Sequence, residues 1–460
     1  MAARGSKSAA LLLAAMLGAG PAVAAELPPA ERDAIDGSMR AWLASTGAPS
    51  VSIAVVKDGA LAYAHAYGEA RLSPDRPAGT GTRYAVDSVS KAFTASAILL
   101  LQQQNKLHLD DPVSRYIPGL SGGDTVTIRQ LLSHTAGLRD YWPQDFVPPE
   151  MSRPITLAAL LKEWATKPLD FPPGTDWQYS NTGYVVAGAI VEKVSGETLM
   201  SFLRRDIFTP LGMTRVTEDD TAPLPAEDAG AYTRYGLGPV RPAPKEGAGW
   251  LFAASELAMN PSTLAKWDIS LINRSLLQPA SYDALFTPQI LKTGKSTHYG
   301  LGEDIDDADG RLEISHDGAG SGFLAANALW PKERIAIVAL TNNDWASPQD
   351  ALNRIAYVVL PPTAAEARAR AVFDGFRRGE VDRSLFTADA NAYLTSAVLA
   401  DQKRGLSALG AVREFRLKKE SLRGGMRTRI WMVDTDTRRV KVVERAYPAG
   451  GIEQFMVMLP

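Results

Sequence analysis

The sequence predicts a mixed α/β domain followed by a smaller α+β domain. Two strand-like runs near the start, Val51 to Val56 and Leu61 to Tyr67, precede a long and mostly helical region. Strand-like sequence returns at Gly310 to Ile314 and at Ile335 to Thr341. Strands at both ends of a helical insert predict one mixed α/β unit with a helical subdomain beside its sheet.

The second domain is predicted to begin after Pro361-Pro362. Ala364 to Arg378 has the pattern of an amphipathic helix, and Arg383 to Ala400 predicts a second helical stretch with a break near Thr387. Four strand-like runs follow: Val412 to Leu417, Arg427 to Val433, Val440 to Arg445 and Ile452 to Met458. Helices followed by an antiparallel sheet are typical of an α+β domain. We therefore expect one domain at residues 26–362 and an accessory domain at residues 363–460.

The first 25 residues have the composition of a secretory signal peptide. Arg4 and Lys7 form a basic start, residues 9–19 are apolar, and Ala22-Val23-Ala24 is an A-x-A cleavage site. A membrane anchor is the alternative, but the apolar run is too short for a typical transmembrane helix. We expect an exported chain, secreted or periplasmic, that begins near Ala25 and has no stable membrane anchor.

Composition excludes several classes of protein. The chain has no cysteine, which excludes cysteine catalysis and thiolate metal sites. Its five histidines include no His-x-x-x-His pair, and no P-loop motif occurs, so we expect neither a metal nor a cofactor. The net charge of −2 indicates no particular partner. Because the basic residues of the second domain are interspersed with acidic ones, we expect no nucleic acid partner.

Ser88-Val89-Ser90-Lys91 is the most informative stretch of the chain. It opens a long apolar segment, Ala92 to Leu101, that predicts a helix. A serine at a helix start lies near the positive end of the helix dipole, and a lysine three residues later lies on the same face. The amine can reach the serine hydroxyl if burial or a neighbouring cation keeps it neutral. A capping serine beside a solvated lysine would give the same pattern.

Two further motifs support the first. Tyr179-Ser180-Asn181 lies between a Pro-Pro-Gly turn and an apolar helix, where it can place a phenol and a carboxamide in one cleft. His316-Asp317-Gly318 precedes strand-like sequence, and its glycine permits close approach of another backbone segment. A core tyrosine with a capping asparagine, and a glycine-rich hairpin, are the alternatives. His134, at a helix end before Gly137, is interpreted as a structural residue.

In order and spacing these motifs resemble those of the β-lactamase-related serine hydrolases, which include class C β-lactamases, D-alanyl-D-alanine carboxypeptidases, D-aminopeptidases and esterases. The resemblance runs from about Ala34 to about Leu360. It implies a serine β-lactamase/penicillin-binding-like fold, in which helices flank an antiparallel sheet and form a helical subdomain. The C-terminal domain more weakly resembles nuclear transport factor 2-like folds, which implies a binding or packing role.

The resemblance also implies a role for each motif residue. Ser88 would be the nucleophile that forms an acyl-enzyme, Lys91 would be its base, and Tyr179 would pass the proton to the leaving group. The remaining motif residues would bind the substrate: Asn181, His316, Gly318 and Ala319. The backbone N–H groups of Ser88 and Ala319 would form the oxyanion hole.

One position departs from the β-lactamase pattern. Typical β-lactamases have Lys-Thr-Gly where this chain has His316-Asp317-Gly318, and that lysine helps to hold a substrate carboxylate. Histidine has an ordinary pKa of about 6.5 and is mostly neutral at pH 7. We therefore expect carboxylate binding to strengthen as the pH falls through the titration of His316. The change disfavours recognition of β-lactams and leaves the acyl-enzyme mechanism intact.

These observations together predict a serine hydrolase that cleaves a peptide, a D-amino-acid amide or an ester. Its substrate would be a small molecule, a peptide or a peptidoglycan fragment. A true β-lactamase and a non-catalytic, penicillin-binding-like sensor are the alternatives. The sequence leaves the substrate within these classes and the oligomeric state open.

Overall fold

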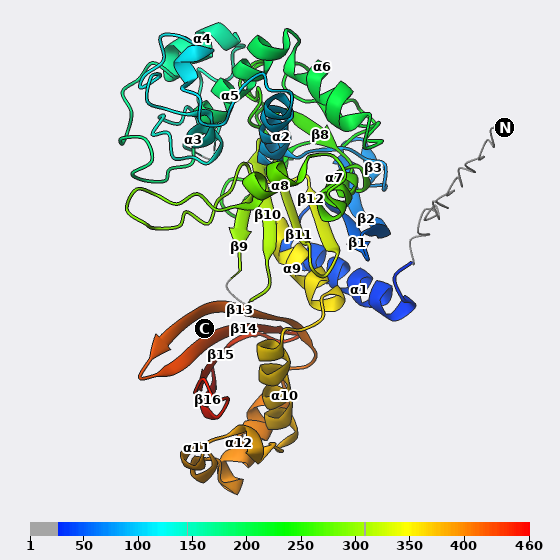
Figure 1. Ribbon diagram of the computed structural model, residues 1–460. Coiled ribbons are helices and arrows are strands. Elements are labelled where there is room, and N and C mark those ends of the chain that lie inside the picture. Colours follow the sequence, from blue (N-terminus) through cyan, green and yellow to red (C-terminus); the bar gives the residue numbers. More distant parts are fainter. Residues whose placement is uncertain (1–25, 145, 308–309) are drawn as a thin grey trace, which may run out of the picture.

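A computed structural model describes residues 26–144, 146–307 and 310–460 (Figure 1). It shows a mixed α/β unit and, beyond residue 362, a separate small unit with its own sheet. The expected fold class is therefore confirmed. The predicted signal peptide, residues 1–25, lies outside the described residues. In the part of the chain that is described, no helix is long and apolar enough to cross a membrane.

A seven-stranded antiparallel sheet forms the centre of the first unit, with the strand order β3-β2-β1-β12-β11-β10-β9. Its first and last strands in sequence lie side by side, because β1 pairs with β12. The strands are β1 (Ser50–Lys57), β2 (Ala60–Leu72), β3 (Asp75–Pro77), β9 (Asp304–Asp306), β10 (Glu313–Gly320), β11 (Phe323–Trp330) and β12 (Ile335–Thr341).

Helices cover both faces of this sheet, because successive strand side chains point to opposite sides. Val51, Ile53 and Val55 of β1 pack with α1 (Pro29–Thr46) and α9 (Pro348–Val359). Ala54 and Val56 face the larger core on the other side. That core contains α2 (Ser90–Gln103) and α7 (Pro261–Asn273), with α8 (Pro279–Phe286) beside α2.

The long central region is helical, as expected. Its helices are α3 (Ile128–Leu132), α4 (Leu157–Trp164), α5 (Asn181–Ser195) and α6 (Leu199–Leu203). Short strands connect this subdomain to the sheet: β4 (Tyr84–Ala85), β5 (Thr217–Glu218), β6 (Tyr232–Thr233), β7 (Arg241–Pro242) and β8 (Leu257–Met259). Strand β8 pairs with both β4 and β5, so it joins the segment before Ser88 to the middle of the chain.

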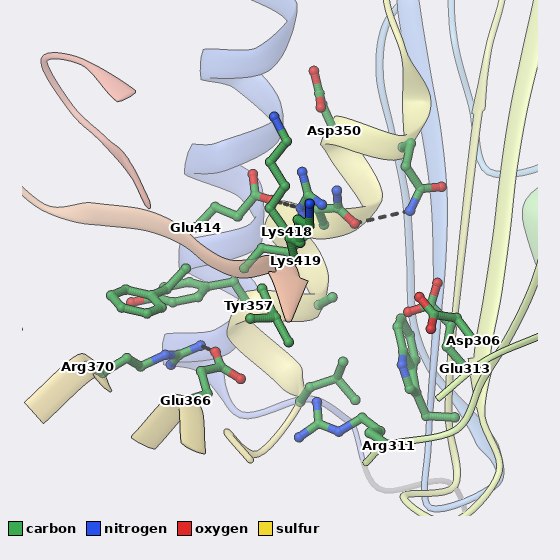
Figure 2. Close-up of a pocket in the computed structure, with 18 of the residues that line it drawn as sticks. Asp306, Arg311, Glu313, Asp350, Tyr357, Glu366, Arg370, Glu414, Lys418 and Lys419 are labelled. Atoms are coloured by element: carbon green, nitrogen blue, oxygen red, sulfur yellow. Dashed lines mark hydrogen bonds and ion pairs between the residues drawn. The ribbon is translucent and has the colours of Figure 1, made fainter. Parts of the chain in front are cut away.

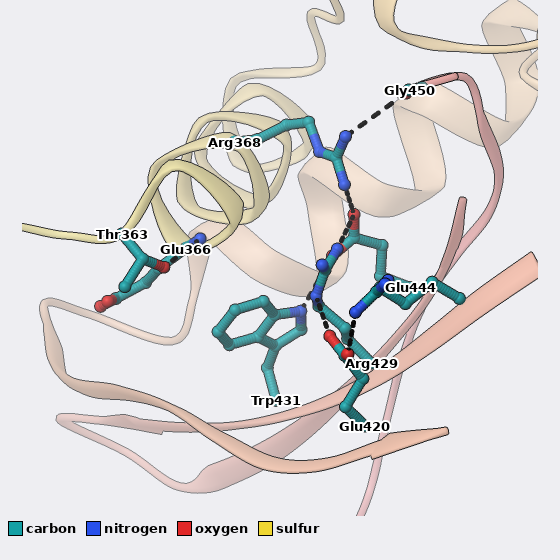
Figure 3. Close-up of polar contacts among 9 residues, drawn as sticks. Thr363, Glu366, Arg368, Glu420, Arg429, Trp431, Glu444 and Gly450 are labelled. Carbon is teal, nitrogen blue, oxygen red and sulfur yellow. Dashed lines mark hydrogen bonds and ion pairs between the residues drawn. The ribbon is translucent and has the colours of Figure 1, made fainter. Parts of the chain in front are cut away.

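The C-terminal unit has three helices followed by a four-stranded antiparallel sheet. Its helices are α10 (Ala364–Arg378), α11 (Ala388–Tyr393) and α12 (Ser396–Ser407), and its strands are β13 (Val412–Arg423), β14 (Met426–Thr435), β15 (Arg439–Ala446) and β16 (Ile452–Met458). Figure 3 shows how α10 is fixed to this sheet. The fully buried carboxylate of Glu444 accepts hydrogen bonds from the Arg368 guanidinium and the Trp431 indole N–H.

The two units enclose a cavity of about 410 Å³ between the edge of β10, α9 and β13 (Figure 2). Its lining is mostly polar and of mixed charge and includes Arg311, Glu313 and Lys418. Beside it, the Arg370 guanidinium lies 4.1 Å from the centre of the Tyr357 ring. None of the predicted site residues lines this cavity.

The structure changes the bounds of two elements predicted from the sequence. The strand predicted at residues 310–314 is β10, which begins at Glu313 and continues through Gly320. Pairing with β11 extends it through residues whose glycine content disfavours a strand locally. The second C-terminal helical stretch has the expected break at Thr387, but it also breaks at Thr395 and continues to Ser407, because each threonine caps the N-terminus of a new helix.

Candidate active site

Ser88 lies in a single turn of 3₁₀-helix, Asp87–Val89, that leads directly into α2. Asp87 has a φ of 46°, in the left-handed region that non-glycine residues rarely occupy. Such strain is often found where a functional side chain is held in a fixed position. Ser88 is half-buried, so its hydroxyl lies where a substrate can reach it, whereas Lys91 is fully buried.

The Lys91 amine is held by three acceptors. Its Nζ donates to Ser88 Oγ at 2.9 Å, to Asn181 Oδ1 at 2.8 Å and to the carbonyl oxygen of Ala254 at 3.0 Å. Burial lowers the pKa of Lys91 to about 7, and the negative charges of Asp140 and Asp87 act in the opposite direction. A substantial fraction of neutral amine is therefore available near pH 7, within hydrogen-bonding distance of the Ser88 hydroxyl.

Tyr179 completes the group around the serine. Its side chain interacts with that of Ser88, and the centre of its ring lies 4.8 Å from Lys91 Nζ. Burial raises the pKa of Tyr179, so the side chain stays a neutral phenol that can donate a proton. Serine hydroxyl, lysine amine and phenol thus meet in one place.

Asp140 is a part of the site that the sequence motifs did not reveal. It is buried, and it accepts hydrogen bonds from the backbone N–H of Asn181 at 3.1 Å and from Asn181 Nδ2 at 3.3 Å. This fixes the orientation of the amide and turns Asn181 Oδ1 toward Lys91. Asp140 belongs to no recognisable motif, and only the folded chain places it next to Asn181.

His134 has the environment of a structural residue. Its Nδ1 accepts a hydrogen bond from the backbone N–H of Ser180 at 3.1 Å, and its ring packs on Tyr179 with 4.2 Å between centroids. Burial lowers the pKa of His134 well below the ordinary value, so the ring is neutral. His134 therefore supports the loop that carries Tyr179.

His316 is near the site, but the expected titration is wrong. It is 4% exposed, its Nδ1 is bonded to the carbonyl oxygen of Asp317 at 2.6 Å, and its Nε2 to the Tyr299 hydroxyl at 2.9 Å. Since a carbonyl only accepts, Nδ1 carries the hydrogen and Nε2 accepts from the tyrosine. Burial, together with the charge of Lys91, lowers the pKa of His316 to about 3. The ring therefore stays neutral across the physiological range and cannot act as a pH-dependent cation.

Gly318 lies where β10 passes the turn that carries Ser88. A Cβ atom at position 318 would lie 2.2 Å from the carbonyl oxygen of Val86, so only glycine fits without displacing backbone. Strand β9 pairs with β10 only up to Ser315, so the following residues, including the exposed Ala319, lie beyond that pairing. The structure thus brings the third motif to the Ser88 turn.

The profile of the beta-lactamase family matches residues 32–359. The chain belongs to the beta-lactamase family. The expected resemblance is confirmed by this match, which covers all but the first and last few residues of the first unit and ends before the C-terminal one. The motifs and their neighbours Asp140, His134 and Tyr299 all lie inside the matched region.

The similar proteins include a penicillin-binding protein and a D-aminopeptidase. The chain is 29% identical over 308 residues to penicillin-binding protein 4* of Bacillus subtilis, a match covering 64% of this chain and 68% of that protein. It is 29% identical over 318 residues to a D-aminopeptidase of Cereibacter sphaeroides, covering 68% of this chain and 60% of the relative. The chain thus spans less than two thirds of that D-aminopeptidase.

A solved structure gives the same picture. A D-stereospecific amidohydrolase from Streptomyces sp. is 26% identical, with a TM-score of 0.62, and the match covers 71% of this chain and 98% of that one. Members of the beta-lactamase family such as the D-aminopeptidase are serine hydrolases, and this chain is a member of that group of enzymes.

Proposed function

We propose that this protein is an exported serine hydrolase that forms an acyl-enzyme on Ser88 and cleaves D-aminoacyl amides, short peptides or esters. The observation that carries the proposal is the 2.9 Å contact between Lys91 Nζ and Ser88 Oγ, made by a buried amine whose pKa is about 7. Export rests on the signal-like composition of residues 1–25.

In the proposed reaction, neutral Lys91 removes the proton from Ser88 Oγ as that oxygen attacks the substrate carbonyl carbon. The backbone N–H groups of Ser88 and Ala319 stabilise the oxyanion, each contributing about 3 kcal/mol. Tyr179 gives its proton to the leaving nitrogen or oxygen and regains one from protonated Lys91. A water molecule, activated by the same groups, then hydrolyses the acyl-enzyme and restores Ser88.

Asn181 and the third motif are proposed to bind the substrate. The Asn181 amide is held by Asp140 and touches Lys91, so it can orient both the base and the acyl group. Gly318 and Ala319 present the backbone of β10 beside the Ser88 turn, where an extended acyl group can add along the strand. His316 supplies a neutral, hydrogen-bonded ring behind them.

Two observations separate this proposal from its alternatives. A β-lactamase gains from a fixed cation at the third motif, and His316 is neutral there. A non-catalytic sensor requires no activated base, yet Lys91 is buried, with a lowered pKa, against Ser88. The relatives named above indicate D-aminoacyl substrates, which is the class we propose.

Intact-mass spectrometry after treatment with a fluorophosphonate tests the nucleophile. The wild type should gain one adduct per chain, and Ser88→Ala should gain none while remaining folded, because the half-buried Ser88 caps no helix and losing its hydrogen bond costs only about 1 kcal/mol. The substrate class is tested with D- and L-aminoacyl anilides, short esters and a chromogenic cephalosporin. Hydrolysis of the D-anilide should exceed that of the L-anilide. A faster reaction with the cephalosporin would identify a β-lactamase instead.

A further inference from the structure

Three carboxylates gather behind the active site, outside the group described above. One oxygen atom from each of Glu218, Asp220 and Glu256 lies within 4.8 Å of the other two. Strand pairing brings them together, because Glu218 ends β5, Glu256 directly precedes β8, and β5 pairs with β8. Glu218 and Asp220 are two residues apart, Glu256 lies far from both in the sequence, and the three form no recognised motif.

Two of the three are deeply buried, and one oxygen atom is left without a donor. Asp220 is 5% exposed and Glu256 is 3% exposed. Asp220 Oδ1 accepts the backbone N–H groups of Gly249 and Leu251, at 2.9 and 3.1 Å. Glu256 Oε1 has no hydrogen-bond partner among the described residues. A buried carboxylate oxygen in this condition is costly unless a proton or a cation compensates it.

The nearby basic residues supply only part of that compensation. Arg204 acts on Glu218, and Lys245, which is paired with the neighbouring Asp219 at 2.7 Å, also acts on Asp220. Glu192 adds a further negative charge to Glu218 and Glu256. Burial raises the pKa of all three cluster residues.

We propose that Glu218, Asp220 and Glu256 form a calcium-binding site. The donors are hard carboxylate oxygens, which calcium and magnesium prefer and zinc does not require. Calcium binds oxygen at roughly 2.3–2.6 Å in a flexible geometry, so ligand atoms on one ion lie no more than about 5.2 Å apart, whereas magnesium demands a near-octahedral arrangement and usually keeps several water molecules. The three cluster oxygens all lie within 4.8 Å of one another, which is inside this limit. Glu218 is only half-buried, which leaves access for the water molecules that complete the coordination.

The site is connected to the catalytic lysine through one short segment, residues 249–256. Asp220 holds the start of this segment, and the Glu256 carboxylate interacts with the backbone N–H of Ala253 near its end. Ala253 has a φ of 60°, and the carbonyl of the next residue, Ala254, accepts the hydrogen bond from Lys91 Nζ. An ion that joins Asp220 to Glu256 would therefore fix the backbone that positions the amine.

The expectation of no metal came from the spacing of histidine and cysteine, which does not test for carboxylate sites. The competing explanation is that the three carboxylates share protons. The two explanations are separated by comparing Glu256→Gln with the wild type, without calcium and with it. Glu256→Gln removes the charge and keeps the shape, so without calcium it should be at least as stable as the wild type. With calcium present, the variant should not show the rise in Tm that the wild type shows.

The experiment uses the full chain after treatment with EGTA. Calorimetric titration with CaCl₂ should show one ion per chain, and a concentration of about 100 times the Kd should raise the Tm by about 3 °C. MgCl₂ should give a smaller rise. Glu218→Gln and Glu256→Gln should abolish both binding and the Tm rise. Asp219→Asn, next to the cluster but paired with Lys245, should keep them and serves as the matched control.

The site is overturned if the wild type shows no binding and no Tm change up to about 5 mM CaCl₂, which exceeds the Kd of weak calcium sites in proteins, roughly 1 mM. It is also overturned if calcium stabilises both glutamine variants as much as the wild type. Neither readout depends on turnover, so a failure here leaves the proposed hydrolase reaction untouched. Because Glu218 is half-buried, its variant is expected to fold even if Glu256→Gln does not.

Discussion

Asp140 accepts hydrogen bonds from both the backbone and the side-chain amide of Asn181, and so determines which end of that amide faces Lys91. The oxygen atom is turned toward the amine and the nitrogen toward the carboxylate. Asp140 touches neither Ser88 nor the proposed substrate position, and it acts through its neighbour. It is a positioning residue of the site.

Asp140→Asn should lower kcat by about 10- to 100-fold, because the Asn181 amide loses its fixed orientation. The charge of Asp140 also holds the pKa of Lys91 up, so its removal should move the acid limb of the kcat/KM profile to lower pH. The measurement is kcat/KM against pH for wild type and variant. A loss of activity with an unmoved limb would indicate a general structural defect instead.

The activity should fall on acidification through the pKa of Lys91, about 7. Below that pH the amine is protonated and cannot accept the Ser88 proton, so kcat/KM should drop about tenfold per pH unit and level off above pH 8. His316 is the competing origin of such a limb, but its pKa is about 3. His316→Gln should therefore lower activity without moving the limb, and a moved limb would assign the titration to His316.

Lys91 and Tyr179 should behave as one proton path. Lys91→Ala and Tyr179→Phe should each lower kcat by at least about 100-fold, and the double variant should lose little more than the worse single one. The four rates form a kinetic cycle with one substrate at one pH. Multiplicative losses would show that the two side chains act in separate steps. Circular dichroism of each variant controls for folding.

A chain truncated after Leu360 should still be acylated by a fluorophosphonate, because the motifs and Asp140 precede that point. Removing the C-terminal unit exposes the ring of Tyr357 and the lining of the interdomain cavity, so lower solubility is expected. Labelling and thermal unfolding of the truncated chain are the measurements. Cooperative unfolding without any labelling would mean that residues beyond 360 help to build the site.

Local patterns in the sequence predicted most helices and strands. Features that depend on contacts between distant residues could not be predicted. The apolar run after Lys91 forms α2, and the strand at Ile452–Met458 begins and ends where it was expected. Asp140 and the Glu218 cluster could not be predicted, because loop packing and strand pairing place them. The extended β10 was missed because its partner β11, rather than its own composition, stabilises it. The neutrality of His316 depends on burial, which no motif contains.

Gly318 has a consequence for how the selectivity of this enzyme can change. The nearest backbone oxygen would lie 2.2 Å from a Cβ at this position, so even alanine would push β10 away from the Ser88 turn. The spacing of the proposed oxyanion donors therefore depends on the absence of one carbon atom. New substrate specificities cannot arise by moving β10 away from the Ser88 turn, because the catalytic step would be lost first. Substitutions that alter substrate preference should accumulate in the surrounding loops, and position 318 should tolerate none in a functional library.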